Sequence, residues 1–101
     1  MKQPEALIEI LLNDKCRIDE RDDAAMDLSE YDEIEAEEAL ISIAKDKKEP
    51  SLLVASAGES LAEIWLRNRK IKIQLIKSLR EEASNEILSF LEAKAPELLS
   101  S

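Results

Sequence analysis

The chain of 101 residues has no histidine and a single glycine. Without an imidazole it cannot form a histidine-dependent catalytic triad, an HExxH zinc site or a Glu-x-x-His di-iron site. One glycine is also too few for a glycine-rich loop that cradles phosphates at a helix N-terminus. We therefore predict a protein that is not an enzyme, with no catalytic residue, no cofactor and no metal ligand.

Cysteine and long apolar runs are scarce as well. Cys16 is the only cysteine, so no internal disulfide can form, and this favours a reducing, cytoplasmic location. Its neighbours Lys15 and Arg17 are the only groups that would activate it as a nucleophile, and we interpret it as an unreactive thiol. The acids Glu5 and Glu9 interrupt the first apolar stretch, which argues against a signal peptide. No apolar run approaches the roughly 20 residues that a membrane span needs.

Aromatic residues make up only 3% of the chain, whereas hydrophobic residues make up 45%. Residues that favour helices dominate, so we predict one all-α domain over residues 1–101, with five to six antiparallel helices. The apolar spacing places helices at about 4–16, 19–31, 32–46 and 51–67. It leaves open whether residues 71–95 form one helix or two. Asp19 is predicted to cap the second helix, and Asp32 with Glu35 is predicted to form a capping box before the third.

Two stretches of the chain match at an offset of 33 residues. Aligning residues 23–31 on residues 56–64 pairs Ala24 with Ala57, Ala25 with Gly58, and Leu28 with Leu61. The residues that follow align less well, at an offset of 35. A glycine inside a helix costs about 1 kcal/mol relative to alanine, so Gly58 predicts a close approach by a neighbouring helix. A period of this length in a helical chain is typical of α-solenoid repeats.

The run of residues 21–46 carries Ala24-Ala25-x-x-Leu28 and then Ala36-x-x-x-Leu40-x-x-x-Ala44. It resembles a HEAT repeat of the short bacterial type, and Ala57-Gly58-x-x-Leu61 begins a similar second copy. The resemblance implies two HEAT-like helix pairs, at about 20–48 and 51–82, with capping helices at about 4–16 and 84–95. It also implies a scaffold for protein interactions, in a family without shared catalytic residues.

The formal charge is -9, and all of it lies in the first half of the chain. Residues 1–50 hold 16 acids and 7 bases, whereas residues 51–101 hold 7 of each. This charge disfavours binding to nucleic acid and favours a basic protein partner, whose approach it would accelerate. The candidate partner-binding residues are Asp19, Glu20, Asp22, Asp23, Asp27, Glu30, Asp32, Glu33 and Glu37. The hypothesis we favour is an immunity-type protein that inhibits a basic toxin or enzyme.

Other interpretations of the same acids stay open. They could simply solvate a helical surface, or belong to a cytosolic adaptor or assembly subunit. Asp19, Asp23 and Asp27 lie four residues apart, a spacing that places carboxylates on one helix face as Mg²⁺ or Ca²⁺ would need. Glu30-x-x-Glu33 and Glu35-x-x-Glu38 are similar to paired carboxylates in all-α nucleotide pyrophosphatases, which makes a Mg²⁺-dependent enzyme the third hypothesis.

The second half carries the basic residues Arg67, Arg69, Lys70, Lys72, Lys77 and Arg80. No aromatic residue is interleaved with them, so we predict that they cap the fourth helix and pair with acids elsewhere in the fold. Trp65 and Tyr31 are predicted to belong to the core.

Overall fold

The computed structural model describes residues 2–99, and over that range all regular structure is helical. The α-helices are α1 (Glu5–Leu12), α2 (Ile18–Asp27), α3 (Ile34–Lys45), α4 (Ser51–Asn68), α5 (Ile73–Ile76) and α6 (Glu81–Lys94). Short 3₁₀ turns follow α2 at Leu28–Glu30 and α6 at Pro96–Leu98. The predicted all-α class is confirmed.

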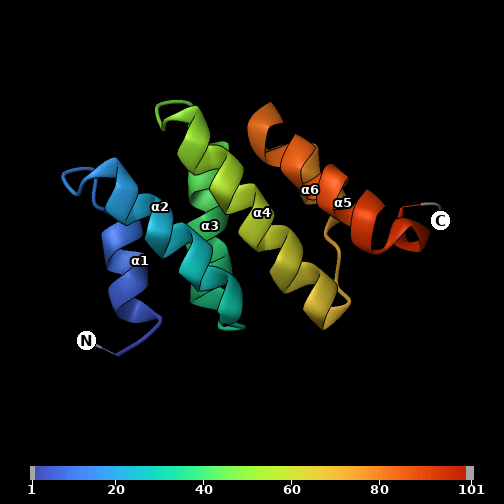
Figure 1. Cartoon of the computed structure of the whole chain (residues 1–101), viewed down its shortest axis with the longest axis horizontal. Helices are drawn as coiled ribbons and strands as arrows, with labels where there is room; N and C mark the ends of the chain where they lie inside the picture. The colour runs from blue at the N-terminus through green and yellow to red at the C-terminus, as the bar shows by residue number, and fades with distance from the viewer. Residues whose placement is uncertain (1, 100–101) are drawn as a thin grey trace.

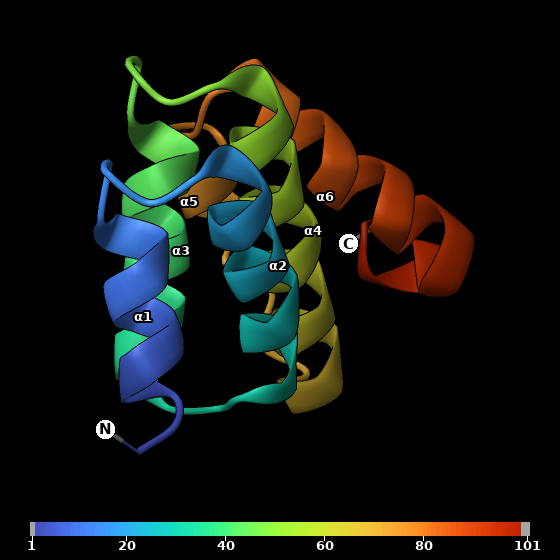
Figure 2. The same ribbon diagram turned by 60° about the vertical axis from the view of Figure 1, so that its left-hand side comes forward.

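The helices lie in two layers. In Figure 2, α1 and α3 form one layer, and α2 and α4 form the other. Figure 1 shows that α6 extends the second layer, so that α2, α4 and α6 lie side by side. Helix α4 is central, since it packs against α2, α3 and α6.

The core lies where the two layers meet. Leu28 of the first 3₁₀ turn and Leu61 of α4, which the 33-residue offset paired, are both fully buried. Trp65 is buried as predicted, whereas Tyr31 is only half-buried at the edge of the core.

Gly58 lies where α4 and α6 come closest. A Cβ atom added to Gly58 would lie 2.6 Å from the carbonyl oxygen and 2.7 Å from the Cα atom of Ala83 on α6. Real Cβ atoms essentially never approach so closely, which confirms that this glycine marks a close approach by a neighbouring helix.

Two predicted helix caps are wrong. Helix α2 begins at Ile18 rather than after Asp19, and the backbone N–H of Arg17 donates to Glu20 at 3.2 Å. Asp19 lies in the first turn of α2, where its Oδ1 accepts from the N–H of Glu20 at 3.0 Å and its carboxylate pairs with the guanidinium of Arg17. Helix α3 begins at Ile34, and Asp32 is held by residues of α4. At Asp32 a guanidinium and an amide bind the carboxylate that was predicted to bind backbone N–H groups, whereas Asp19 lies inside the helix that it was predicted to cap.

Residues 71–95 form a single helical turn followed by one continuous helix. Within the apolar stripe at residues 71–79, α-helix is confined to the four residues of α5. The next helix, α6, starts after Arg80. Ser84 lies inside α6 and does not cap it. Its hydroxyl donates to the carbonyl of Ile76 at 2.8 Å and so ties α6 to α5.

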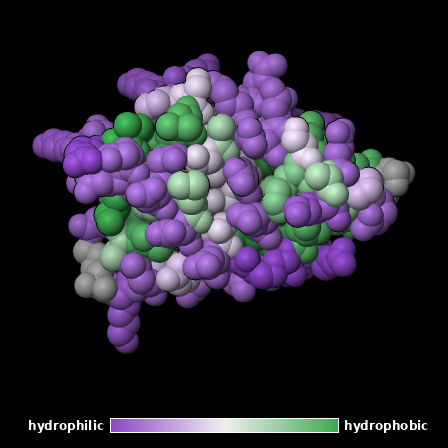
Figure 3. All heavy atoms as spheres, viewed as in Figure 1, coloured by the Kyte–Doolittle hydropathy of each residue, from purple (hydrophilic) through white to green (hydrophobic). Residues whose placement is uncertain are grey.

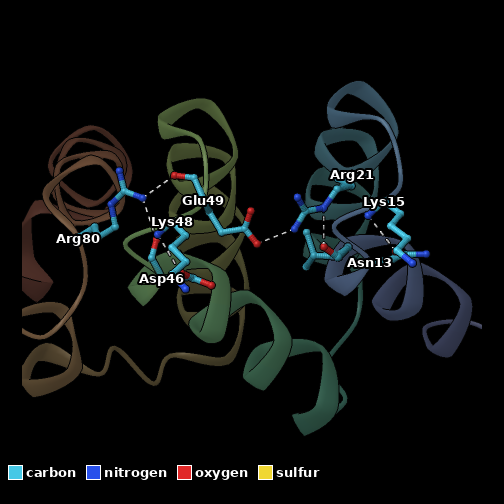
Figure 4. Close-up of polar contacts among 8 residues, drawn as sticks. Asn13, Lys15, Arg21, Asp46, Lys48, Glu49 and Arg80 are labelled. Carbon is cyan, nitrogen blue, oxygen red and sulfur yellow. Dashed lines mark hydrogen bonds and ion pairs between the residues drawn. The ribbon is translucent and has the colours of Figure 1, made fainter.

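The α1–α2 and α3–α4 loops have the same local hydrogen bonds, 33 residues apart (Figure 4). The N–H of Lys15 donates to the side-chain oxygen of Asn13 at 3.0 Å, and the N–H of Lys48 donates to that of Asp46 at 2.9 Å. Each is the turn in which a short polar side chain binds backbone two residues ahead.

Two arginines bind the α3–α4 loop from opposite sides (Figure 4). Arg21 of α2 is buried, donates to the Leu11 carbonyl at 2.9 Å and pairs with Glu49 at 2.6 Å. Arg80 donates to the carbonyls of Asp46 at 2.8 Å and Glu49 at 2.7 Å. This loop therefore joins the first helices of the chain to the last.

Candidate functional site: an acidic surface beside a cleft

The nine candidate partner-binding acids lie on α2, on α3 and on the segment between them. Asp19, Glu20, Asp22, Asp23 and Asp27 belong to α2, Glu30 to the 3₁₀ turn, Asp32 and Glu33 to the loop, and Glu37 to α3. The face of the molecule formed by α2, α4 and α6 shows hydrophilic side chains interspersed with apolar patches (Figure 3).

Some of these acids already have partners within the chain. Asp19 pairs with Arg17, and this hydrogen bond lowers the pKa of Asp19. Asp32 accepts from Arg67 at 2.7 Å and from Asn68 at 3.0 Å. The hydrogen bond from Arg67, followed by that from Asn68, lowers the pKa of Asp32. The bonds of Asp32 join the start of α3 to the end of α4, whereas the exposed pair of Asp19 with Arg17 is local to the start of α2.

Glu37 has the most constrained carboxylate of the set. Its side chain is 13% exposed, accepts from the indole N–H of Trp65 at 2.7 Å and pairs with Lys72 at 2.8 Å. The contact with Trp65 joins residues 28 positions apart in the sequence.

Four of the nine acids are exposed and have a side-chain carboxylate that binds no residue in the described range: Asp23, Asp27, Glu30 and Glu33. The first three recur at intervals of four and three residues, which places them along one side of α2 and its 3₁₀ extension. Asp22 differs from them, since its Oδ1 atom is buried and has no hydrogen-bond partner among residues 2–99. We define the acidic surface as Asp23, Asp27, Glu30 and Glu33.

A cleft of about 410 Å³ lies where the start of α3 meets the end of α4. Its lining residues are Asp32, Ile34, Glu37, Ile64, Trp65, Asn68, Lys70 and Lys72. A volume of this size is within the range of small-ligand sites. The acids Asp32 and Glu37 of the candidate set thus line a cleft that the sequence pattern did not indicate.

Three of the six residues of the basic run pair with acids, and in two of these pairs the acid lies far away in the sequence, as predicted. Arg67 binds Asp32, Lys72 binds Glu37, and Arg80 binds Glu82 at 2.6 Å. Glu82 also accepts from the hydroxyl of Ser51, and these bonds, led by that from Ser51, lower its pKa to about 2.

Within residues 2–99, no group of three or more potential ligands is placed to hold a metal ion. The series Asp19, Asp23 and Asp27 is thus not a metal cluster. None of the described helices combines the length and apolar character needed to cross a membrane. Cys16 is a free, half-buried thiol.

Comparison of the chain with protein-family models, with curated proteins and with solved structures finds no match.

Proposed function

We propose that this protein binds a basic protein through the acidic surface, as an immunity-type inhibitor of a bacterial toxin or other basic enzyme. The observation that carries the proposal is that Asp23, Asp27, Glu30 and Glu33 are exposed and unpaired. Other acids of the same region are paired with arginine or lysine. Arginine and lysine side chains therefore lie close to this region, but none of them pairs with these four carboxylates.

The physical basis is electrostatic. Like charges four residues apart on a helix destabilise it by a few tenths of a kcal/mol, so Asp23 and Asp27 carry a cost in the free protein. A net charge of -9 attracts a basic protein over distances of about a Debye length and raises the association rate. A cationic partner would also remove the repulsion.

We further propose that the scaffold is a HEAT-like α-solenoid, and two correspondences at the same offset support this. Residues 5–10 read EALIEI and residues 38–43 read EALISI, five identities in six positions. The loops after α1 and α3 share the same hydrogen bonds, as described above. These correspondences favour a unit made of α1 with α2, repeated as α3 with α4, in place of the helix pairs at about 20–48 and 51–82 that the resemblance implies. A lone cysteine and a binding function without cofactor are compatible with a cytoplasmic inhibitor.

The proposal is tested by capturing partners from a lysate of the source organism at low salt, purifying the basic protein retained and measuring its binding kinetics. We expect the association rate to fall steeply as salt reduces the Debye length from about 10 Å to about 3 Å, with little change in dissociation. Replacing the four acids of the acidic surface by their amides should slow association about tenfold at low salt.

The matched control replaces Glu59, Glu81, Glu86 and Glu92, four exposed acids of the second half, by glutamine. It removes the same charge from a different surface, so association should slow much less. Equal effects of the two variants would show that only net charge matters. Association of the acidic-surface variant at the parental rate would refute the inhibitor hypothesis in favour of an adaptor that binds through another face.

A further inference from the structure

A lysine side chain of the protein, that of Lys72, occupies part of the cleft between α3 and α4 and pairs with a carboxylate there. Lys72 follows α4 in the segment that leads to α5, and its ammonium group lies 2.8 Å from the carboxylate of Glu37. The Lys72 side chain is 46% exposed, whereas that of Glu37 is only 13% exposed. The anion is therefore fixed in the wall and the cation lies at the solvent side.

Trp65 fixes the orientation of the Glu37 carboxylate from the core side of the cleft. Its indole N–H donates to Oε2 of Glu37 at 2.7 Å, and Trp65 itself is 1% exposed. A carboxylate held this way loses little side-chain entropy when it binds a new partner, which is the condition for a preorganised site. Exchanging Lys72 for another cation would leave this support in place.

A second carboxylate at the cleft has an available oxygen. All the bonds that Asp32 accepts from Arg67 and Asn68 end on Oδ1, at 2.7–3.1 Å. Oδ2 accepts no bond from a residue of the described range, and the Asp32 side chain is 58% exposed. The cleft thus offers one fixed carboxylate and one free carboxylate oxygen.

The rest of the wall is apolar. Ile64 and Trp65 line the cleft, and Ile34, at the first turn of α3, is 63% exposed. An isoleucine so exposed beside a cleft provides an apolar contact for whatever enters.

We propose that the cleft takes the side chain of an arginine presented by the basic partner. This deepens the proposed function and rests on it. The guanidinium displaces Lys72 from Glu37 and donates to Oδ2 of Asp32, while its aliphatic stem packs on Ile34. Arginine fits better than lysine because its planar group carries five donors and can bind two acceptors at once.

The charges that line the cleft balance, since Lys70 and Lys72 offset Asp32 and Glu37. The preference for a cation rests on the position of the two carboxylates, which a bound phosphate or carboxylate would face within a chain of net charge -9. An arginine needs only Lys72 to swing outward into solvent.

The experiment uses the fluorescence of Trp65, the single tryptophan of the chain, to follow titration with N-acetyl-arginine-amide. We expect a saturable change with half-saturation at millimolar concentration, on the order expected for one side chain. Lys72→Ala should lower the half-saturation concentration about fivefold, because it removes the internal competitor. Glu37→Gln should abolish the change, and the neighbouring exposed Glu38→Gln should leave it intact.

The neutral isostere N-acetyl-citrulline-amide and inorganic phosphate are the comparison probes. An equal response to citrulline, no response to arginine in Lys72→Ala, or a response to phosphate alone would each overturn the proposal. Circular dichroism shows whether Glu37→Gln folds. If it does not fold, the response of Lys72→Ala to arginine still tests the proposal. A cleft that ignores arginine while the acidic surface still governs association with the partner would refute this inference and leave the proposed function standing.

Discussion

Replacing Gly58 by alanine tests the close approach of α4 and α6 directly. The new Cβ atom would lie 2.6 Å from the carbonyl oxygen and 2.7 Å from the Cα atom of Ala83, both backbone atoms of α6. Backbone atoms cannot move aside by changing a rotamer, so α6 as a whole must shift. Overpacking of this kind costs about 1–3 kcal/mol, and a whole-helix shift places the cost at or above the upper end.

The alanine also brings a gain of about 1 kcal/mol in helix propensity. We therefore expect Gly58→Ala to lower the free energy of unfolding by about 2 kcal/mol, measured by urea denaturation followed by circular dichroism. Glu59→Ala, at the next and exposed position of α4, is the control and should change it by less than about 0.5 kcal/mol.

A second variant distinguishes the cause. Because the atoms that clash belong to the backbone of Ala83, adding Ala83→Gly should not rescue Gly58→Ala. A Gly58→Ala protein as stable as the parent, or more stable, would refute the close approach and the packing of α4 on α6 derived from it.

Three further predictions concern the core, the buried ion pair and pH. Leu28→Ala and Leu61→Ala each remove a fully buried side chain and should each cost about 2–5 kcal/mol in urea denaturation; a mutant as stable as the parent would contradict their placement. Arg21→Ala strands the carboxylate of Glu49, which is 14% exposed, and should cost about 3–5 kcal/mol, so a thermal midpoint equal to that of the parent would argue against the ion pair. Because folding lowers the pKa of Glu82 from 4.5 to about 2, its contribution to stability is present above pH 4.5 and is lost as pH falls towards 2. Glu82→Gln should flatten the pH dependence of stability in that window, and an unchanged profile would show that these bonds do not act on folding.

Features set by local pattern were predictable from the sequence. The helical class follows from composition and apolar spacing, and the close approach at Gly58 follows because an interior glycine carries a cost in a helix. It was also predictable that the basic run pairs with acids, although not with which acids, since a chain with so many acids offers partners to any basic side chain.

Features that depend on contacts between residues distant in the sequence could not be predicted from the sequence. Nothing near Arg21 marks it as buried, because its partner Glu49 is 28 residues away. The predicted cap at Asp19 was wrong for a local reason, since α2 begins one residue before it. The predicted cap at Asp32 was wrong because its carboxylate binds Arg67, which is 35 residues away. The cleft was missed for the same reason, since its walls come from separate segments. The match of residues 5–10 with residues 38–43 is a local pattern at the same offset of 33 residues, and it is visible in the sequence alone.

The two loops of matching geometry differ in how they would accept inserted chain. In the α3–α4 loop, the carbonyls of Asp46 and Glu49 are both bound by Arg80, so added residues would pull apart two acceptors that one guanidinium holds together. In the α1–α2 loop, the carbonyl of Asn13 accepts from Cys16 of the same loop and from no other residue among 2–99. Whether a loop tolerates insertion depends on the bonds of its backbone, not on its local shape. A tag, a fluorescent domain or a crystallisation partner therefore belongs after Asp14, where the chain can open without releasing one end of the molecule from the other.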